Sequence, residues 1–171
     1  ACPCAFVLAT PTAMVAALHF EDRRLTIGGR FTTAGGRPRG NVAVWSQGQW
    51  ESDTPGLLDH DPCPVSATGK VLHEHGGELF AGGSFLSRWY SSAAVRRESG
   101  WVYISGLLRP VHDPLDSGDT RMPEVHRFLS LGDTLVAVGL FEDPSSTPGG
   151  GIAAWDGHGW SFPWPMLDRS S

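Results

Sequence analysis

Two loops of this chain repeat a phrase that is rich in metal-ligating side chains. One loop reads GLLDHDP at residues 56–62 and the other reads GLLRPVHDP at residues 106–114. Imidazole and carboxylate ligands together suit Zn²⁺ or another divalent ion, and clustered carboxylates suit Ca²⁺. One hypothesis is therefore a divalent-cation site built from Asp59, His60, Asp61, His112 and Asp113. We favour the alternative, a polar loop with Asp-Pro turn signals and no cofactor, because the spacing matches no known metal-binding loop.

A third segment carries side chains that suit ligand binding. SFLSRWYSS at residues 84–92 places Arg88, Trp89 and Tyr90 on a predicted loop. Aromatic side chains with an arginine are typical of a protein hot spot, and they also suit the flat face of a sugar. Trp89 or Tyr90 could equally fill a gap in the core, and the sequence leaves both interpretations open.

Motifs that would define a catalytic site are absent from the sequence. His73 and His75 lie in a predicted strand, and we interpret them as facing opposite sides, which makes them a weak metal pair. The sequence contains no G-x-S-x-G elbow, no H-E-x-x-H helix and no phosphate-binding glycine loop. Paired carboxylates have no sequence signature, so a hydrolase of that type stays an alternative.

The elements that must position these residues come from a threefold repeat. RRLTIGGRF (23–31), GELFAGGSF (77–85) and DTLVAVGLF (133–141) each combine a hydrophobic pair, a glycine and a phenylalanine. A second block follows each of them, with an alanine seven residues before a closing tryptophan. The equivalent leucines are Leu25, Leu79 and Leu135, and the closing tryptophans are Trp50, Trp101 and Trp160. The leucines are 54 and 56 residues apart, and strand-like repeats of about this length are typical of propeller blades.

The repeat resembles the blade of bacterial kelch-like β-propellers. Their units read roughly L-x-x-G-G-x-F-T-x-A-G-G, then I-A-x-W-D-G, then W, and LTIGGRFTTAGG followed by NVAVW matches best. The third repeat has Val138 in place of the first glycine, and the second has Arg96 in place of a tryptophan. The resemblance implies an all-β fold with three four-stranded antiparallel blades of about 54 residues. It implies little about function, because propellers host many unrelated activities.

The repeat also predicts the domain organisation and the core. We expect one repeat domain over 1–171, with the closing tryptophans buried between neighbouring sheets. The predicted blades and the long loops that join them are blade 1 at 15–52, loop 53–70, blade 2 at 71–103, loop 104–124 and blade 3 at 125–165.

Composition excludes several classes of function. The chain has 22 Gly, 13 Pro and only 18% charged residues, which suits short strands joined by turns. Its net charge is −5, and no run of Lys and Arg exceeds two, so we expect no nucleic-acid binding. No apolar stretch of about 18 residues predicts a membrane span.

The number and spacing of the cysteines bear on whether the protein forms disulfides in an oxidising compartment. Cys2, Cys4 and Cys63 make an odd number, which is a poor disulfide framework. We slightly favour a bridge from Cys63 to Cys2 or Cys4 and a secreted or extracellular protein. The alternative is that Cys4 and Cys63 occupy equivalent repeat positions, which are too far apart for a disulfide.

Three blades are too few to close a propeller, which predicts partners. Propellers typically have about four to eight blades, and repeat arrays need polar capping units. We therefore expect a homo-oligomer or contact with other protein subunits, a six-bladed dimer being simplest, with AFVLA (5–9) packed on a neighbour. The favoured function is a non-catalytic binding or assembly module. The alternatives are a hydrolase or lyase with acidic residues in the channel, and a lectin-like propeller that binds a glycan.

Overall fold

The computed structural model describes most of the repeat region. The described residues are 14–52, 57, 68–85, 91–104, 111–112, 120–121, 123–141 and 151–164. Within these ranges the chain forms strands and turns and no helix, so the all-β prediction is confirmed there. Accordingly, this part of the chain holds no helix that is long and apolar enough to cross a membrane.

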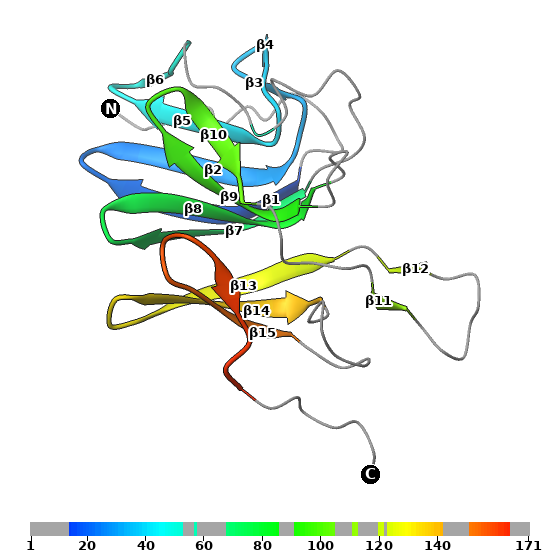
Figure 1. Cartoon of the computed structure of the whole chain (residues 1–171). Coiled ribbons are helices and arrows are strands. Elements are labelled where there is room, and N and C mark those ends of the chain that lie inside the picture. Colours follow the sequence, from blue (N-terminus) through cyan, green and yellow to red (C-terminus); the bar gives the residue numbers. More distant parts are fainter. Residues whose placement is uncertain are drawn as a thin grey trace.

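Three four-stranded antiparallel sheets account for most of the described chain (Figure 1). In each sheet the strands pair in the order in which they follow along the chain. Sheet 1 comprises β1 (Met14–Glu21), β2 (Arg24–Arg30), β5 (Val42–Ser46) and β6 (Gln49–Trp50). Sheet 2 comprises β7 (Thr68–His75), β8 (Glu78–Phe85), β9 (Ser91–Arg97) and β10 (Gly100–Tyr103). Sheet 3 comprises β13 (Glu124–Leu131), β14 (Thr134–Leu140), β15 (Ile152–Trp155) and β16 (Trp160–Ser161).

Two short ladders add to the four-stranded sheets. Two-stranded ladders form between β3 (Thr33–Ala34) and β4 (Arg37–Pro38), and between β11 (Val111–His112) and β12 (Thr120–Arg121). The second ladder lies in a segment that was predicted to be a loop. The described sheets form an open stack of three layers, with sheet 2 in the middle, and not a closed ring (Figure 1).

The repeat predicted the equivalent strand positions correctly. Leu25 pairs with Phe20 on one side and Trp45 on the other, and Leu135 pairs with Ser130 and Trp155 in the same way. The turn between β15 and β16 is held by Oδ1 of Asp156, which accepts hydrogen bonds from the backbone N–H groups two and three residues later. These bonds lower the pKa of the Asp156 carboxyl.

Each sheet has the same bulge between its first two strands. The pairing shifts by one residue between Val15 and Ala17 in sheet 1, and at the equivalent place in sheets 2 and 3. The bulge brings the backbone of the first strand close to the second strand. A Cβ at Gly29 would lie 2.1 Å from the carbonyl oxygen of Met14, and a Cβ at Gly139 would lie 2.0 Å from that of Glu124. The second glycine of the repeat is therefore required by the fold of its own sheet.

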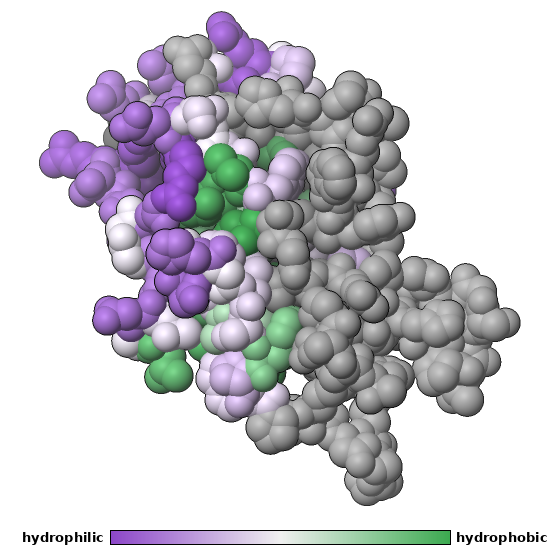
Figure 2. Space-filling view, viewed as in Figure 1, coloured by the Kyte–Doolittle hydropathy of each residue, from purple (hydrophilic) through white to green (hydrophobic). Residues whose placement is uncertain are grey.

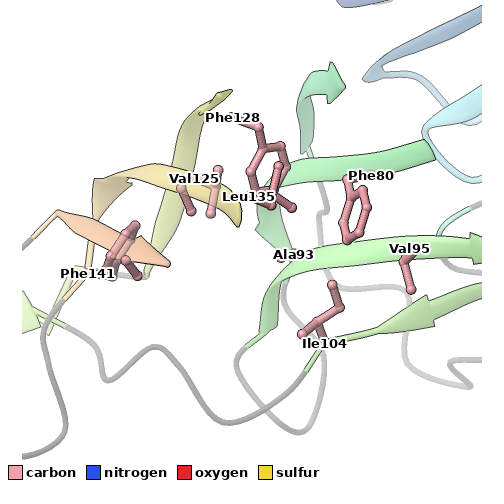
Figure 3. Packing of buried hydrophobic residues seen from close by; sticks show 10 residues of the cluster. Phe80, Ala93, Val95, Ile104, Val125, Phe128, Leu135 and Phe141 are labelled. Carbon is pink, nitrogen blue, oxygen red and sulfur yellow. The ribbon is translucent and has the colours of Figure 1, made fainter. Parts of the chain in front are cut away.

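Sheet 2 is buried on both faces, and the main core lies between it and sheet 3. Phe80 of β8 and Phe128 of β13 meet edge to face, with ring centroids 6.2 Å apart (Figure 3). Val125 and Leu135 of sheet 3 are fully buried in the same cluster. Burying side chains of this size contributes about 1.5–3 kcal/mol each.

The opposite face of sheet 2 packs on sheet 1. Val42 of sheet 1 joins Ala81, Ala94 and Trp101 of sheet 2 in a second buried cluster. Sheets 1 and 2 thus pack face to face through alternate residues of their strands, as the period of two along a strand requires.

The closing tryptophans meet the prediction in part. Trp101 is buried between sheets 1 and 2, and Trp160 is half-buried against the core between sheets 2 and 3. Trp50 lies instead on the face of sheet 1 that points away from sheet 2, where it meets Trp45 edge to face at 5.2 Å. No described four-stranded sheet covers that face. Phe31 and Ala34 of β3 pack there instead, so the burial of Trp50 between two four-stranded sheets is not observed.

The first glycine of the repeat lies where the next sheet packs. A Cβ at Gly82 would lie 2.7 Å from side-chain atoms of Val125 and Phe128 in sheet 3. A Cβ at the equivalent Gly28 would lie 3.6 Å from the carbonyl oxygen of Gly69 and 3.6 Å from a side-chain atom of Leu72 in sheet 2. Sheet 3 has Val138 at this position, and no described sheet packs on it. The exception in the third repeat therefore coincides with the open end of the stack.

This packing predicts unequal effects of one substitution at two equivalent positions. Gly82→Ala should lower the free energy of unfolding by about 1–3 kcal/mol, because the added methyl overpacks the contact between sheets 2 and 3. Gly28→Ala is the matched control and should change it by less than about 1 kcal/mol, since its surroundings lie at ordinary contact distances. Urea unfolding followed by tryptophan fluorescence measures both. Equal losses in the two variants would contradict the packing.

Candidate functional site

Polar side chains gather where the first strands of neighbouring sheets end. We name the face of each sheet that points toward the next sheet along the chain its leading face, and the opposite face its trailing face. On the leading faces lie His19 and Glu21 of β1, and His73 and His75 of β7. Figure 2 shows polar side chains along this edge of sheets 1 and 2.

The first cluster joins sheet 1 to sheet 2. Nε2 of His19 lies 3.6 Å from a carboxylate oxygen of Glu21 and 3.9 Å from one of Glu74, which projects from the trailing face of sheet 2. This nitrogen is buried and makes no hydrogen bond to the described residues, whereas both carboxylates are well exposed. Ion pairs that reach solvent in this way contribute little to stability.

A pocket of about 200 Å³ adjoins the cluster, and Arg96 explains why it exists. Arg96 lines the pocket together with Arg24, Leu79 and Glu74. The equivalent residue in sheet 3 is Trp155, which instead packs against the core between sheets 2 and 3. Because an arginine replaces the bulky ring, the contact between sheets 1 and 2 is polar and hollow around Arg96, beside the buried cluster of Val42 and Trp101.

The electrostatics of the pocket are balanced by neighbouring charges. Burial lowers the pKa of Arg96, and the guanidinium of Arg24 lowers it further, while Glu51 opposes both. Arg24 donates to Glu51 at 2.6 Å. Arg96 remains protonated at physiological pH, since a guanidinium does not titrate in proteins.

The second cluster joins sheet 2 to sheet 3 and corrects one prediction. Nε2 of His73 and Nδ1 of His75 both lie 2.9 Å from Oγ of Ser130. Nε2 of His75 lies 3.2 Å from the carbonyl oxygen of Asp133, to which it can donate a hydrogen bond. The prediction that these histidines face opposite sides is therefore wrong. Residues two apart in a strand share a face, and the bulge lies before both of them.

The environment of His73 favours its neutral form. Burial lowers the pKa of His73 below its usual value of 6.5, and the imidazoles of His75 and His19 lower it further, while Glu74 opposes the shift. The Ser130 hydroxyl carries a single proton, so it donates to one of the two imidazoles and accepts a hydrogen bond from the N–H of the other.

The two clusters differ in the chemistry that they can support. The donor atoms of His19, Glu21 and Glu74 all lie within 4.8 Å of one another, and an imidazole with two carboxylates is a ligand set that Zn²⁺ accepts. The contact of Ser130 with two imidazoles is one that a general base makes with a hydroxyl nucleophile. The same two contacts also join sheet 2 to sheet 3, and the surrounding aromatic packing supports this structural role.

The predicted site residues fall largely outside the described residues. For His112 the structure describes the backbone, in β11, but not the side chain. The others lie wholly outside the described ranges, and the three cysteines lie there with them: Asp59, His60, Asp61, Asp113, Arg88, Trp89, Tyr90, Cys2, Cys4 and Cys63. The cation-site and ligand-site hypotheses therefore stay predictions.

Sequence reasoning missed the cluster of His19, Glu21 and Glu74. An alignment of the repeats could have found it, because His19 aligns with His73, and Glu21 aligns with His75. Equivalent positions lie on the same face of each sheet, so the alignment would have placed His19 and Glu21, as well as the two histidines, on leading faces. The partners Glu74 and Ser130 occupy equivalent positions on trailing faces, one residue out of phase with the histidines.

Comparison with known proteins finds no family model and no curated protein that matches this chain.

The environment of His73 predicts a pH dependence of stability. The folded state binds the proton on His73 more weakly than the unfolded state, so the contribution is complete above about pH 6.5 and is lost as the pH falls below it. The free energy of unfolding should therefore drop between about pH 7.5 and about pH 5.5, and His73→Gln should reduce this drop. Urea unfolding at both pH values measures it, with His158→Gln in an exposed turn as the control. An unchanged drop in His73→Gln would contradict this assignment.

Proposed function

We propose that this chain is a non-catalytic assembly module, whose three sheets are blades of a propeller-type array and whose two end faces pack on further blades. The threefold repeat, the resemblance to kelch-like blades and the equivalent bulges in the three sheets support this proposal. The packing of each sheet on the next supports it as well, since blades pack face to face in the same way.

The exposed end faces carry the proposal. On the trailing face of sheet 1, Leu18 is 63% exposed and Phe20 is 71% exposed. On the leading face of sheet 3, Leu129 is 48% exposed and Leu131 is 64% exposed. Figure 2 shows hydrophobic surface beside the β13–β14 hairpin. Apolar surface gathered in this way marks an interaction site.

Equivalent positions inside the stack are covered. Leu72 and Phe128 occupy the position of Leu18 in sheets 2 and 3, and both pack in clusters between sheets. Fully burying one leucine or phenylalanine contributes about 1.5–3 kcal/mol. Covering both end faces therefore provides a driving force for association.

The proposal predicts that the chain does not exist alone in solution. Light scattering after size-exclusion chromatography should give a mass above the 18.4 kDa of one chain. An apolar contact should also survive about 1 M salt, because screening weakens charge pairs and not apolar burial. A monomer of 18.4 kDa at every concentration would contradict the proposed function.

A further inference from the structure

Inside the molecule, each sheet contact places two leading-face residues against one trailing-face residue. Between sheets 1 and 2, His19 and Glu21 flank Glu74. Between sheets 2 and 3, His73 and His75 flank Ser130, which contacts both rings. The two contacts use equivalent positions of the repeat, so consecutive sheets pack on each other through the same three positions.

The two open faces carry the same three positions, but with apolar residues. On the leading face of sheet 3, the positions of the paired histidines are occupied by Leu129 and Leu131. On the trailing face of sheet 1, the position of Glu74 and Ser130 is occupied by Phe20. At both internal contacts, two polar residues of one sheet thus meet one polar residue of the next sheet. On the end faces, the two leucines and Phe20 occupy the equivalent positions, and all three are apolar.

We propose that the leading face of sheet 3 binds the trailing face of sheet 1 in a second copy of this chain, with Phe20 of one copy between Leu129 and Leu131 of the other. The inference rests on the proposed assembly function and names its partner. Two copies of three sheets related by a twofold axis then close a ring of six, in which both intermolecular contacts are identical. The new contact continues the packing that already joins sheet 1 to sheet 2 and sheet 2 to sheet 3.

Two other residues of the leading face of sheet 3 are compatible with this contact. Val138 occupies the position that Gly82 has in sheet 2. Gly82 contacts Phe128, and Leu18 is the equivalent of Phe128 in sheet 1, so the proposed contact places Leu18 against Val138. Leucine is smaller than phenylalanine, which offsets part of the volume that valine adds. Arg127 is exposed at the edge of the same face, where its aliphatic stem can cover apolar surface while its charge stays in water.

Paired charge substitutions test this arrangement in the full-length chain. Phe20→Lys and Leu129→Glu should each weaken the dimer on the order of a hundredfold or more, because each places an unpaired charge in both contacts. The chain that carries both substitutions should dimerise again, since the lysine of one copy then meets the glutamate of the other. Sedimentation equilibrium measures the dissociation constants, and the restored dimer should weaken at high salt.

Control variants separate this inference from the proposed function. Val102→Lys changes a residue of sheet 2 that is 45% exposed and lies away from both end faces, and it should leave the dimer intact. Leu131→Glu replaces Leu129→Glu if the latter fails to fold, as judged by circular dichroism. If both single variants lose the dimer and the double variant stays monomeric, the chain assembles but not with this pairing. If neither single variant weakens the dimer, another surface carries the assembly and the inference is overturned. A monomeric wild type overturns the inference and the proposed function together.

Discussion

The packing of one sheet on the next at the first glycine of the repeat is the contact on which the rest of this structure depends. At Gly82 the first strand of sheet 3 comes so close that a methyl group would overlap Val125 and Phe128. The approach is possible because Gly82 has no side chain, and a bulge interrupts the pairing of the first two strands at the same place in each sheet. It fixes which faces are buried between the described sheets and which two faces lie at the ends of the stack.

The polar features of the molecule follow from the same geometry. Once two sheets meet at the glycine, the residues beyond it face each other near the hairpin ends, where water can reach them. That region holds the cluster around His19 and the bonds from His73 and His75 to Ser130. The pocket near Arg96 belongs to it too, because Arg96 occupies the position where sheet 3 has Trp155.

The sequence predicted the sheets well and the site poorly, for physical reasons. Spacing and alternation are local properties, so the strands around Leu25 and Leu135 were predicted from residue types alone. The pairing of His19 with Glu74 depends on which sheet follows which, and it emerges only when the repeats are aligned face by face. The bulge and the hollow near Arg96 depend on backbone geometry, which a motif does not specify. The ligand hypotheses at His60 and Trp89 concern residues outside the described ranges.

The most direct test of the proposed contact between two chains is photo-cross-linking from the leading face of sheet 3. A benzoylphenylalanine in place of Leu131 reacts with whatever lies against it on irradiation, and peptide mapping identifies the product. The proposed contact predicts a cross-link to β1 of a second chain, between Met14 and Phe20. Links confined to the same chain, or to peptides of sheet 2 in another chain, would contradict it.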